Sequence, residues 1–121
     1  MRRSMSAKGD KKGKREMTKF ISIYVTVKDK EEAEKIANIL VDEKLAACVN
    51  IIPNIVSIYN WKGVRERSEE VSMFIKTKNA LFKDVAKRIK SVHSYDVPCI
   101  VSLPIIEGDK DYLKWLEDET K

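Results

Sequence analysis

The stretch from residue 46 to residue 60, AACVNIIPNIVSIYN, constrains the fold of this chain more than any other feature. It is rich in β-branched residues and predicts a strand, which a turn at Lys62 and Gly63 returns into a second strand over residues 70–77. Strands in globular proteins usually have about 5–6 residues. A hairpin this long has more apolar surface than two helices can cover, so it predicts a closed homo-oligomer.

Two details of the hairpin carry further predictions. Pro53 has no backbone N–H to donate, so the first strand should be bent, bulged or at a sheet edge there. Residues 62–70, KGVRERSEE, are mostly charged, which discourages the exposed tip from pairing with foreign strands.

The other segments alternate between strand and helix patterns. Asp29 is followed three residues later by Glu32, the spacing of a capping box, so a helix should begin there. Asp109 should cap a short helix near the C-terminus. The remaining predicted elements are strands at 20–27 and 97–106, the first helix up to about Lys44, and a second helix at 80–92.

The resulting order, β-α-β-β-α-β with an added C-terminal helix, predicts an α+β fold of the ferredoxin-like type. Right-handed crossovers give one antiparallel sheet with the spatial strand order 4-1-3-2 and both main helices on one face. Cys48 and Cys99 then belong to opposite edges of the sheet, so no disulfide should join them within a chain.

The net charge of +5 is concentrated at the N-terminus. Residues 1–19 contain eight basic and two acidic residues, which leaves 16 basic and 17 acidic residues for the rest of the chain. We therefore expect residues 1–18 to form a disordered basic tail and residues 19–121 to form the folded domain. Because the domain itself carries no basic excess, we expect no nucleic-acid partner.

The sequence also argues against a membrane protein and against the common enzyme classes. No apolar run approaches the roughly 20 residues that span a bilayer, and the N-terminus lacks the core of a secretory signal. We therefore predict a cytoplasmic protein without a membrane partner, although Arg2 and Arg3 leave organelle targeting open. The four glycines form no phosphate-binding loop, and a single histidine excludes an HExxH metal site. We expect no catalytic residues.

The only histidine, His93, lies in the segment SVHSYDVPCI at residues 91–100 and allows two interpretations. It can be an exposed helix-end histidine at the joint between a helix and a strand. Alternatively, His93 can hold a soft or borderline metal ion together with neighbouring groups, because imidazole and thiolate suit copper(I) or zinc. In a strand over residues 97–106, Asp96 and Cys99 would point to opposite faces and would not share a metal ion within one chain.

Four segments together make the chain resemble the CutA divalent-cation tolerance family. They are KLAACVNIIPNIVSIYNWKG at 44–63, EEVSMFIKT at 69–77, VHSYDVPCIVSLPI at 92–105 and DYLKWL at 111–116. The resemblance covers residues 20–119 and implies a ferredoxin-like trimer, similar to the PII signalling proteins and locked by long hairpins.

The site motif of this chain departs from the usual pattern of the family. The family motif reads His-Pro-Tyr-Glu-Val-Pro-Glu, and here Ser94, Asp96 and Cys99 replace its first proline and both glutamates. Bacterial members can carry a first-strand cysteine implicated in copper binding, where this chain has Val25.

The resemblance implies two functional hypotheses. The first is a non-enzymatic homotrimer that binds a divalent metal ion, with copper favoured, through His93, Asp96 and Cys99. The alternative is a PII-like signalling or scaffold trimer that binds a small molecule or a protein partner in clefts between subunits. Aromatic walls and one cation for such a cleft would come from Tyr59, Trp61, Lys76, Tyr95, Tyr112 and Trp115.

Overall fold

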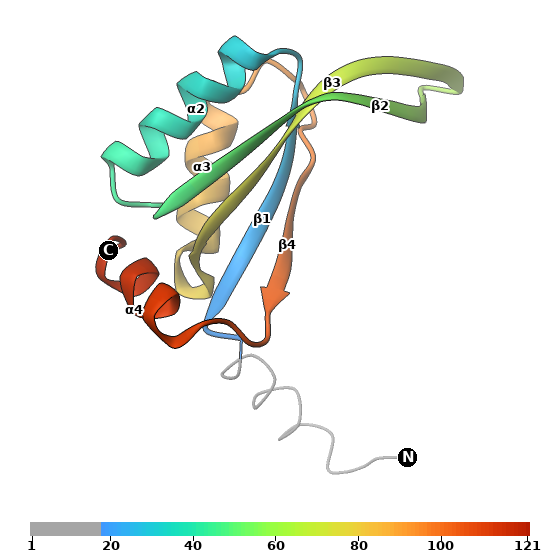
Figure 1. The fold of residues 1–121 in the computed structure, drawn as a ribbon. Coiled ribbons are helices and arrows are strands. Elements are labelled where there is room, and N and C mark those ends of the chain that lie inside the picture. The colour runs from blue at the N-terminus through green and yellow to red at the C-terminus, as the bar shows by residue number, and fades with distance from the viewer. Residues whose placement is uncertain (1–17) are drawn as a thin grey trace, which may run out of the picture.

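The computed structural model describes residues 18–121, so the predicted disordered tail, residues 1–18, lies outside the described part except for Thr18. The elements follow the predicted order (Figure 1). They are β1 (Phe20–Val27), α2 (Lys30–Asp42), β2 (Cys48–Trp61), β3 (Val64–Lys78), a 3₁₀ turn (Asn79–Leu81), α3 (Phe82–Val92), β4 (Ile100–Ile105) and α4 (Lys110–Asp118).

The four strands form one antiparallel sheet in the order β2-β3-β1-β4, which confirms the predicted topology and the α+β fold class. Helices α2 and α3 cover one face of this sheet (Figure 1). Alternate residues of β1 and β3 point toward the helices and build the core with them. Its fully buried side chains include Ile21, Ile23, Val25, Ile36, Leu40, Met73, Ile75, Val85 and Ile89. We call the other face of the sheet the open face.

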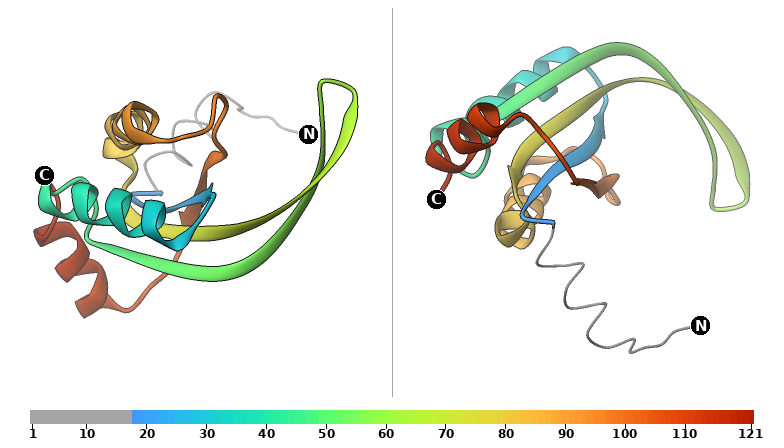
Figure 2. Two further views of the ribbon diagram at one scale, coloured as in Figure 1. Left: turned by 90° about the horizontal axis from the view of Figure 1, so that it is seen from above. Right: turned by 60° about the horizontal axis from the view of Figure 1, so that its bottom comes forward.

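The hairpin of β2 and β3 is longer than predicted on its returning strand. Backbone pairing continues to Trp61 and Val64, next to the two-residue turn at Lys62 and Gly63, which have φ angles of 52° and 81°. Positive φ at both positions is typical of a type I′ turn. The prediction that the returning strand begins at Glu70 was wrong, because ladder pairing uses the backbone and accepts the charged residues before it. Figure 2 shows the hairpin extending beyond the sheet and curving.

The predicted irregularity at Pro53 is a β-bulge. The register with β3 shifts by one residue between Ile52 and Ile55, and Asn54 has a φ of 65°. An extra residue reverses which face the following side chains occupy. Tyr59 and Trp61 therefore share the open face with Cys48, which lies on the other side of the bulge.

The last strand begins at Ile100 and not at Val97 as predicted. Its pairing with β1 ends at Val25 and Ile100. The backbone carbonyl of Thr26, which would continue that ladder, accepts a hydrogen bond from His93 instead. Residues 96–99 are therefore a loop, and the prediction that strand alternation separates Asp96 from Cys99 does not hold.

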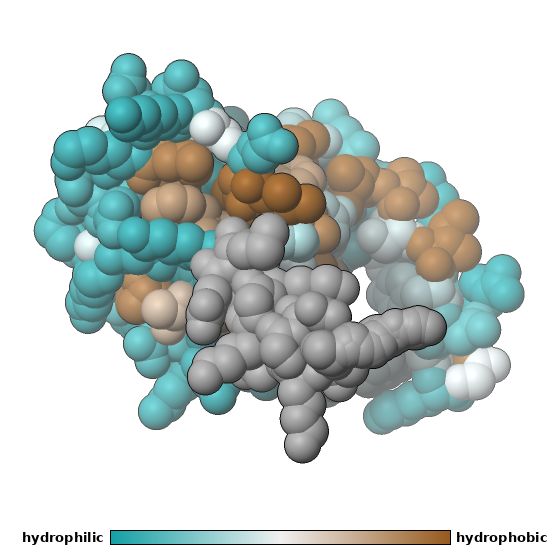
Figure 3. All heavy atoms as spheres, turned by 90° about the horizontal axis from the view of Figure 1, so that it is seen from below, coloured by the Kyte–Doolittle hydropathy of each residue, from teal (hydrophilic) through white to brown (hydrophobic). Residues whose placement is uncertain are grey.

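Large apolar side chains remain exposed on the open face and along the hairpin. Figure 3 shows hydrophobic side chains at the surface when the molecule is viewed from below. The exposed set includes Ile52, Val56, Ile58, Val101 and Leu103. Among the described residues, no helix is both long enough and apolar enough to cross a membrane.

Candidate ligand-binding cavity

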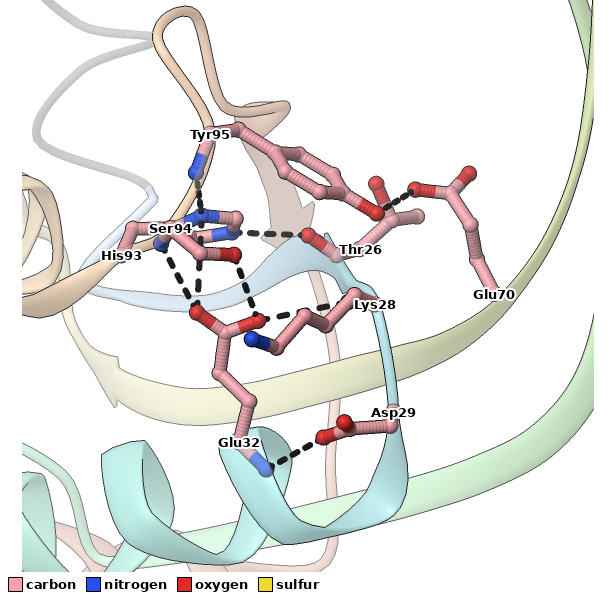
Figure 4. Close-up of polar contacts among 8 residues, drawn as sticks. All are labelled: Thr26, Lys28, Asp29, Glu32, Glu70, His93, Ser94 and Tyr95. Atoms are coloured by element: carbon pink, nitrogen blue, oxygen red, sulfur yellow. Dashed lines mark hydrogen bonds and ion pairs between the residues drawn. The ribbon is translucent and has the colours of Figure 1, made fainter.

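The loop after α3 is fixed by the buried ring of His93. His93 is the C-cap residue of α3, and its side chain has no exposed surface. The Tyr95 backbone N–H donates to Nδ1 over 3.0 Å, so the proton of the neutral ring resides on Nε2, which donates to the Thr26 carbonyl over 2.9 Å. Both ring nitrogens are therefore occupied by protein groups (Figure 4).

Glu32, in the first turn of α2, holds the same loop from the other side. Its carboxylate accepts hydrogen bonds from the Ser94 backbone N–H over 2.8 Å and from the Ser94 hydroxyl over 3.0 Å. It also accepts a bond from the Lys28 backbone N–H over 3.3 Å. Asp29 caps the helix by accepting from the Glu32 backbone N–H over 2.8 Å, as the capping spacing predicted. Glu32 is buried, and its side chain joins the first turn of α2 to the loop after α3 (Figure 4).

Replacing His93 with alanine is expected to lower the free energy of unfolding by about 2 kcal/mol, since it removes a buried ring and leaves two backbone groups without partners. The sequence interpretation of an exposed helix-end histidine predicts a loss below about 1 kcal/mol. Denaturant unfolding separates the two values. A loss within about 0.5 kcal/mol of zero would contradict the buried arrangement.

A cavity of about 730 Å³ lies where the curved hairpin faces the loop after α3 and the end of β1. Its walls combine aromatic rings with acidic groups. The aromatic rings are those of Tyr24, Tyr59, Trp61 and Tyr95, and the acidic side chains are those of Glu66, Glu70 and Asp96. The remaining lining residues are Thr26, Ser57, Val97 and Cys99, and no Lys, Arg or His among the described residues lines the cavity.

Tyr95 and Glu70 connect the loop to the hairpin across this cavity. The Tyr95 hydroxyl donates to Glu70 Oε2 over 2.7 Å (Figure 4). Burial raises the pKa of the Tyr95 phenol far above its ordinary value, and the hydrogen bond to Glu70 adds to the rise. The phenol therefore stays protonated and acts as a donor. Partial burial also raises the pKa of the Cys99 thiol, with a further contribution from the Glu70 charge.

With this geometry established, comparison with known proteins gives a family. The sequence profile described as "CutA1 divalent ion tolerance protein" matches residues 21–119. The chain belongs to the CutA1 divalent ion tolerance family. The family is named for tolerance of divalent ions and not for a reaction, which agrees with the sequence resemblance.

Relatives of this CutA1 family member come from plants, bacteria and archaea. The chain is 44% identical to "Protein CutA, chloroplastic" of Arabidopsis thaliana over 84% of its own length, and spans 56% of the length of that relative. The solved divalent cation tolerance protein of Thermus thermophilus is 43% identical with a TM-score of 0.82, covering 84% of this chain and 99% of that one. The Archaeoglobus fulgidus structure, called periplasmic in its description, is 42% identical with a TM-score of 0.82, covering 84% and 99%.

These names place relatives in different compartments. The plant relative is called chloroplastic and the archaeal structure periplasmic. A cytoplasmic location for this CutA1 family member therefore stays a prediction.

The predicted metal ligands divide into two groups in this CutA1 fold. Asp96 and Cys99 both line the cavity, whereas His93 lies outside it with both nitrogens bonded. Within residues 18–121 of one chain, no group of three or more His, Cys, Asp or Glu side chains is placed to hold a metal ion. The predicted ligand set of His93, Asp96 and Cys99 therefore stays a prediction. The described residues of one copy do not form a metal site from it.

The predicted cleft residues also divide. Tyr59, Trp61 and Tyr95 line the cavity. Tyr112 and Trp115 do not line it: they lie on α4, with their ring centroids 5.6 Å apart. Burial raises the pKa of the Tyr112 phenol, and the nearby Cys48 thiol contributes. Lys76 donates to Asn50 on the neighbouring strand and is not among the residues that line the cavity.

Three acidic residues of the site were missed by sequence reasoning. The sequence pattern assigned Glu32 to helix capping and placed Glu66 and Glu70 only among the charged residues of the hairpin tip. The spacing of Glu66, Ser68 and Glu70 by two residues could have indicated that the two glutamates share one face of the returning strand β3.

Proposed function

We propose that this CutA1 family member is a non-enzymatic homotrimer that binds a divalent metal ion, with copper favoured, through ligands supplied by more than one copy. The observation that carries the proposal is an incomplete ligand set. Asp96 and Cys99 line one cavity, but within residues 18–121 of a single chain they belong to no group of three or more side chains placed to hold a metal ion. We assign ligation to these two residues, and we assign to His93 the positioning of the loop that carries them.

The chemistry of Cys99 supports a soft ion. A thiol ligand binds as the thiolate and favours copper(I) or zinc over magnesium or calcium. Because burial and Glu70 raise the pKa of Cys99, the free protein keeps the thiol protonated. Metal binding must therefore displace a proton, so affinity should increase with pH until the free thiol ionises.

The surface supports assembly. Strands β2 and β4 form the two edges of the sheet, and exposed apolar side chains lie near both edges. Monomeric proteins rarely expose large contiguous apolar patches, and edge strands are usually covered. Three copies are the number that the family resemblance implies.

The metal proposal predicts that Cys99→Ser and Asp96→Asn each weaken copper(I) or zinc binding by about tenfold or more, a loss typical of disturbed metal sites. Isothermal titration under anaerobic conditions measures the affinity. Cys48→Ser is the matched control, because this second free thiol lies outside the cavity, and it should bind as the wild type does. Unchanged affinity in both cavity variants would refute the assignment.

A second function, binding of a small molecule by a signalling or scaffold trimer, is favoured by the cavity itself. Its volume of about 730 Å³ falls within the range of ligand sites, about 300–1,000 Å³. Rings and a few polar groups form its walls, as in sites for organic ligands.

A further inference from the structure

Helix α3 carries three lysines on the side that faces away from the core. Lys83, Lys87 and Lys90 are spaced by four and three residues, which places them next to one another on the helix surface. All three are exposed. The buried side chains of α3, those of Val85 and Ile89, lie on the opposite side of the helix. We call these three lysines, which extend over about 10 Å of helix, the lysine stripe.

The stripe has no acidic partners. On each of the other two α-helices a lysine pairs with an acidic residue one turn further on, Lys30 with Glu34 and Lys114 with Asp118. No ion pair in the described part of the chain involves a lysine of the stripe. The residue one turn after Lys83 is itself a lysine, and like charges at this spacing destabilise a helix.

The helix dipole does not account for the stripe either. A cation in the last turn of a helix interacts favourably with the dipole, which explains Lys90. Lys83 lies in the first turn of α3, where the same interaction is unfavourable. The stripe therefore presents positive charge that the stability of the helix does not require.

The stripe stays at the surface if copies associate through the open face. Helices α2 and α3 cover the other face of the sheet (Figure 1). The large exposed apolar side chains that would be buried between copies lie on the open face and along the hairpin, and none of those in the described part of the chain lies on α3. The exposure of the lysine stripe therefore does not depend on whether the copies are associated.

A groove along one side of the stripe adds a second cation. Its volume is about 270 Å³, and it is lined by Leu45, Asp84, Lys87, Arg88, Ser91 and Lys121. Arg88 already binds Glu43 over 2.8 Å. Lys87 and Lys121 form no ion pair among the described residues, and these two charges outnumber the single carboxylate of the groove, that of Asp84. The groove can therefore accept an acidic side chain next to the stripe.

The surroundings of the stripe favour a narrow anionic partner. Helix α2 packs beside α3 and exposes the carboxylates of Glu31, Glu34 and Asp42. A wide anionic surface such as a membrane would meet these carboxylates and be repelled. Without an exposed large apolar side chain, α3 also has nothing to insert into lipid. A single acidic segment can lie along α3 without contacting α2.

We propose that the lysine stripe binds an acidic segment of a protein partner, whose carboxylates face Lys83, Lys87 and Lys90. This inference goes beyond the proposed metal binding and uses the opposite side of the sheet. An assembly of three copies would present three stripes, so a partner with several acidic segments would bind more tightly than one segment alone.

The test is the fluorescence anisotropy of a labelled decaglutamate peptide, titrated with the full chain at low ionic strength in the presence of EDTA. The substitutions Lys83→Gln, Lys87→Gln and Lys90→Gln, made together, should weaken binding about tenfold, because three surface charge contacts are lost. Raising the ionic strength should weaken binding by the wild type and reduce its difference from this variant.

The matched control combines Lys28→Gln, Lys30→Gln and Lys35→Gln. It removes the same net charge from exposed lysines at the start of α2, so it should bind nearly as tightly as the wild type. The eight basic residues within positions 1–19 are unchanged in both variants, so their contribution cancels in the comparison. Both variants change only exposed side chains, and circular dichroism should show the helix content of the wild type.

Three results would each overturn the inference. Equal affinity of the two triple variants would assign peptide binding to overall charge or to the N-terminal basic residues. Absence of peptide binding by the wild type at low ionic strength would show that the stripe holds no acidic segment. Tighter, stripe-dependent binding of a single-stranded oligonucleotide or of phosphatidylserine vesicles would make the partner a nucleic acid or a membrane.

Discussion

Leu103→Asp is expected to reduce the mass measured by light scattering from about three times 14.0 kDa to about 14.0 kDa. Leu103 lies on the open face of the edge strand β4, opposite Ser22 of β1, and its side chain is exposed in one copy. If this face is buried between copies, aspartate places an unpaired charge in an apolar interface at a cost of several kcal/mol per copy. Such a cost is large enough to separate the subunits.

Ser102→Asp is the matched control for this prediction. Ser102 is the adjacent residue of the same strand and pairs with Ile23, so its side chain points to the opposite side of the sheet from Leu103. This variant should retain the mass of the assembly. A wild-type mass of about 14.0 kDa would contradict the trimer, and loss of assembly in both variants would mean that the open face is not the decisive surface.

Glu32→Ala is expected to lower the free energy of unfolding by about 4 kcal/mol, because it leaves three donors without an acceptor. These donors are the Ser94 backbone N–H, the Ser94 hydroxyl and the Lys28 backbone N–H. Loss of the carboxylate should also release the loop that carries Asp96 and Cys99. Denaturant unfolding measures the first effect, and amide hydrogen exchange at residues 94–96 measures the second.

Glu31→Ala is the control that separates the specific role of the Glu32 carboxylate from the general effect of an acidic residue at the start of α2. Glu31 occupies the same first turn but is exposed, so its loss should cost less than about 0.5 kcal/mol. Equal losses for the two variants would show that charge at the helix N-terminus, and not the link to the loop, is what Glu32 contributes.

Features that depend on local pattern were predictable from the sequence. The caps at Asp29 and Asp109, the turn at Lys62 and Gly63, and the irregularity at Pro53 each depend on a few adjacent residues. The strand order also followed, because right-handed crossovers leave few arrangements for this order of elements.

The candidate site was predictable only in part. Tyr59, Trp61 and Tyr95 line the cavity of one chain, whereas Tyr112, Trp115 and Lys76 do not, and a binding role for any of the six stays a prediction. The side of the sheet to which each β2 side chain beyond Pro53 points depends on how many extra residues the bulge contains. A proline permits a bulge but does not fix its length. With one residue more or fewer, Tyr59 and Trp61 would point away from the loop.

The sequence by itself determined the fold class, the element order and the long hairpin, because these follow from periodicity, capping and turn residues acting over short distances. Only the tertiary structure decided the roles of the charged groups. His93, Glu32 and Glu70 look like surface residues in the sequence, and each is buried by a partner from a distant segment. Burial and pairing arise from long-range packing, so the chemistry of these side chains is set where the loop after α3 meets α2 and the hairpin.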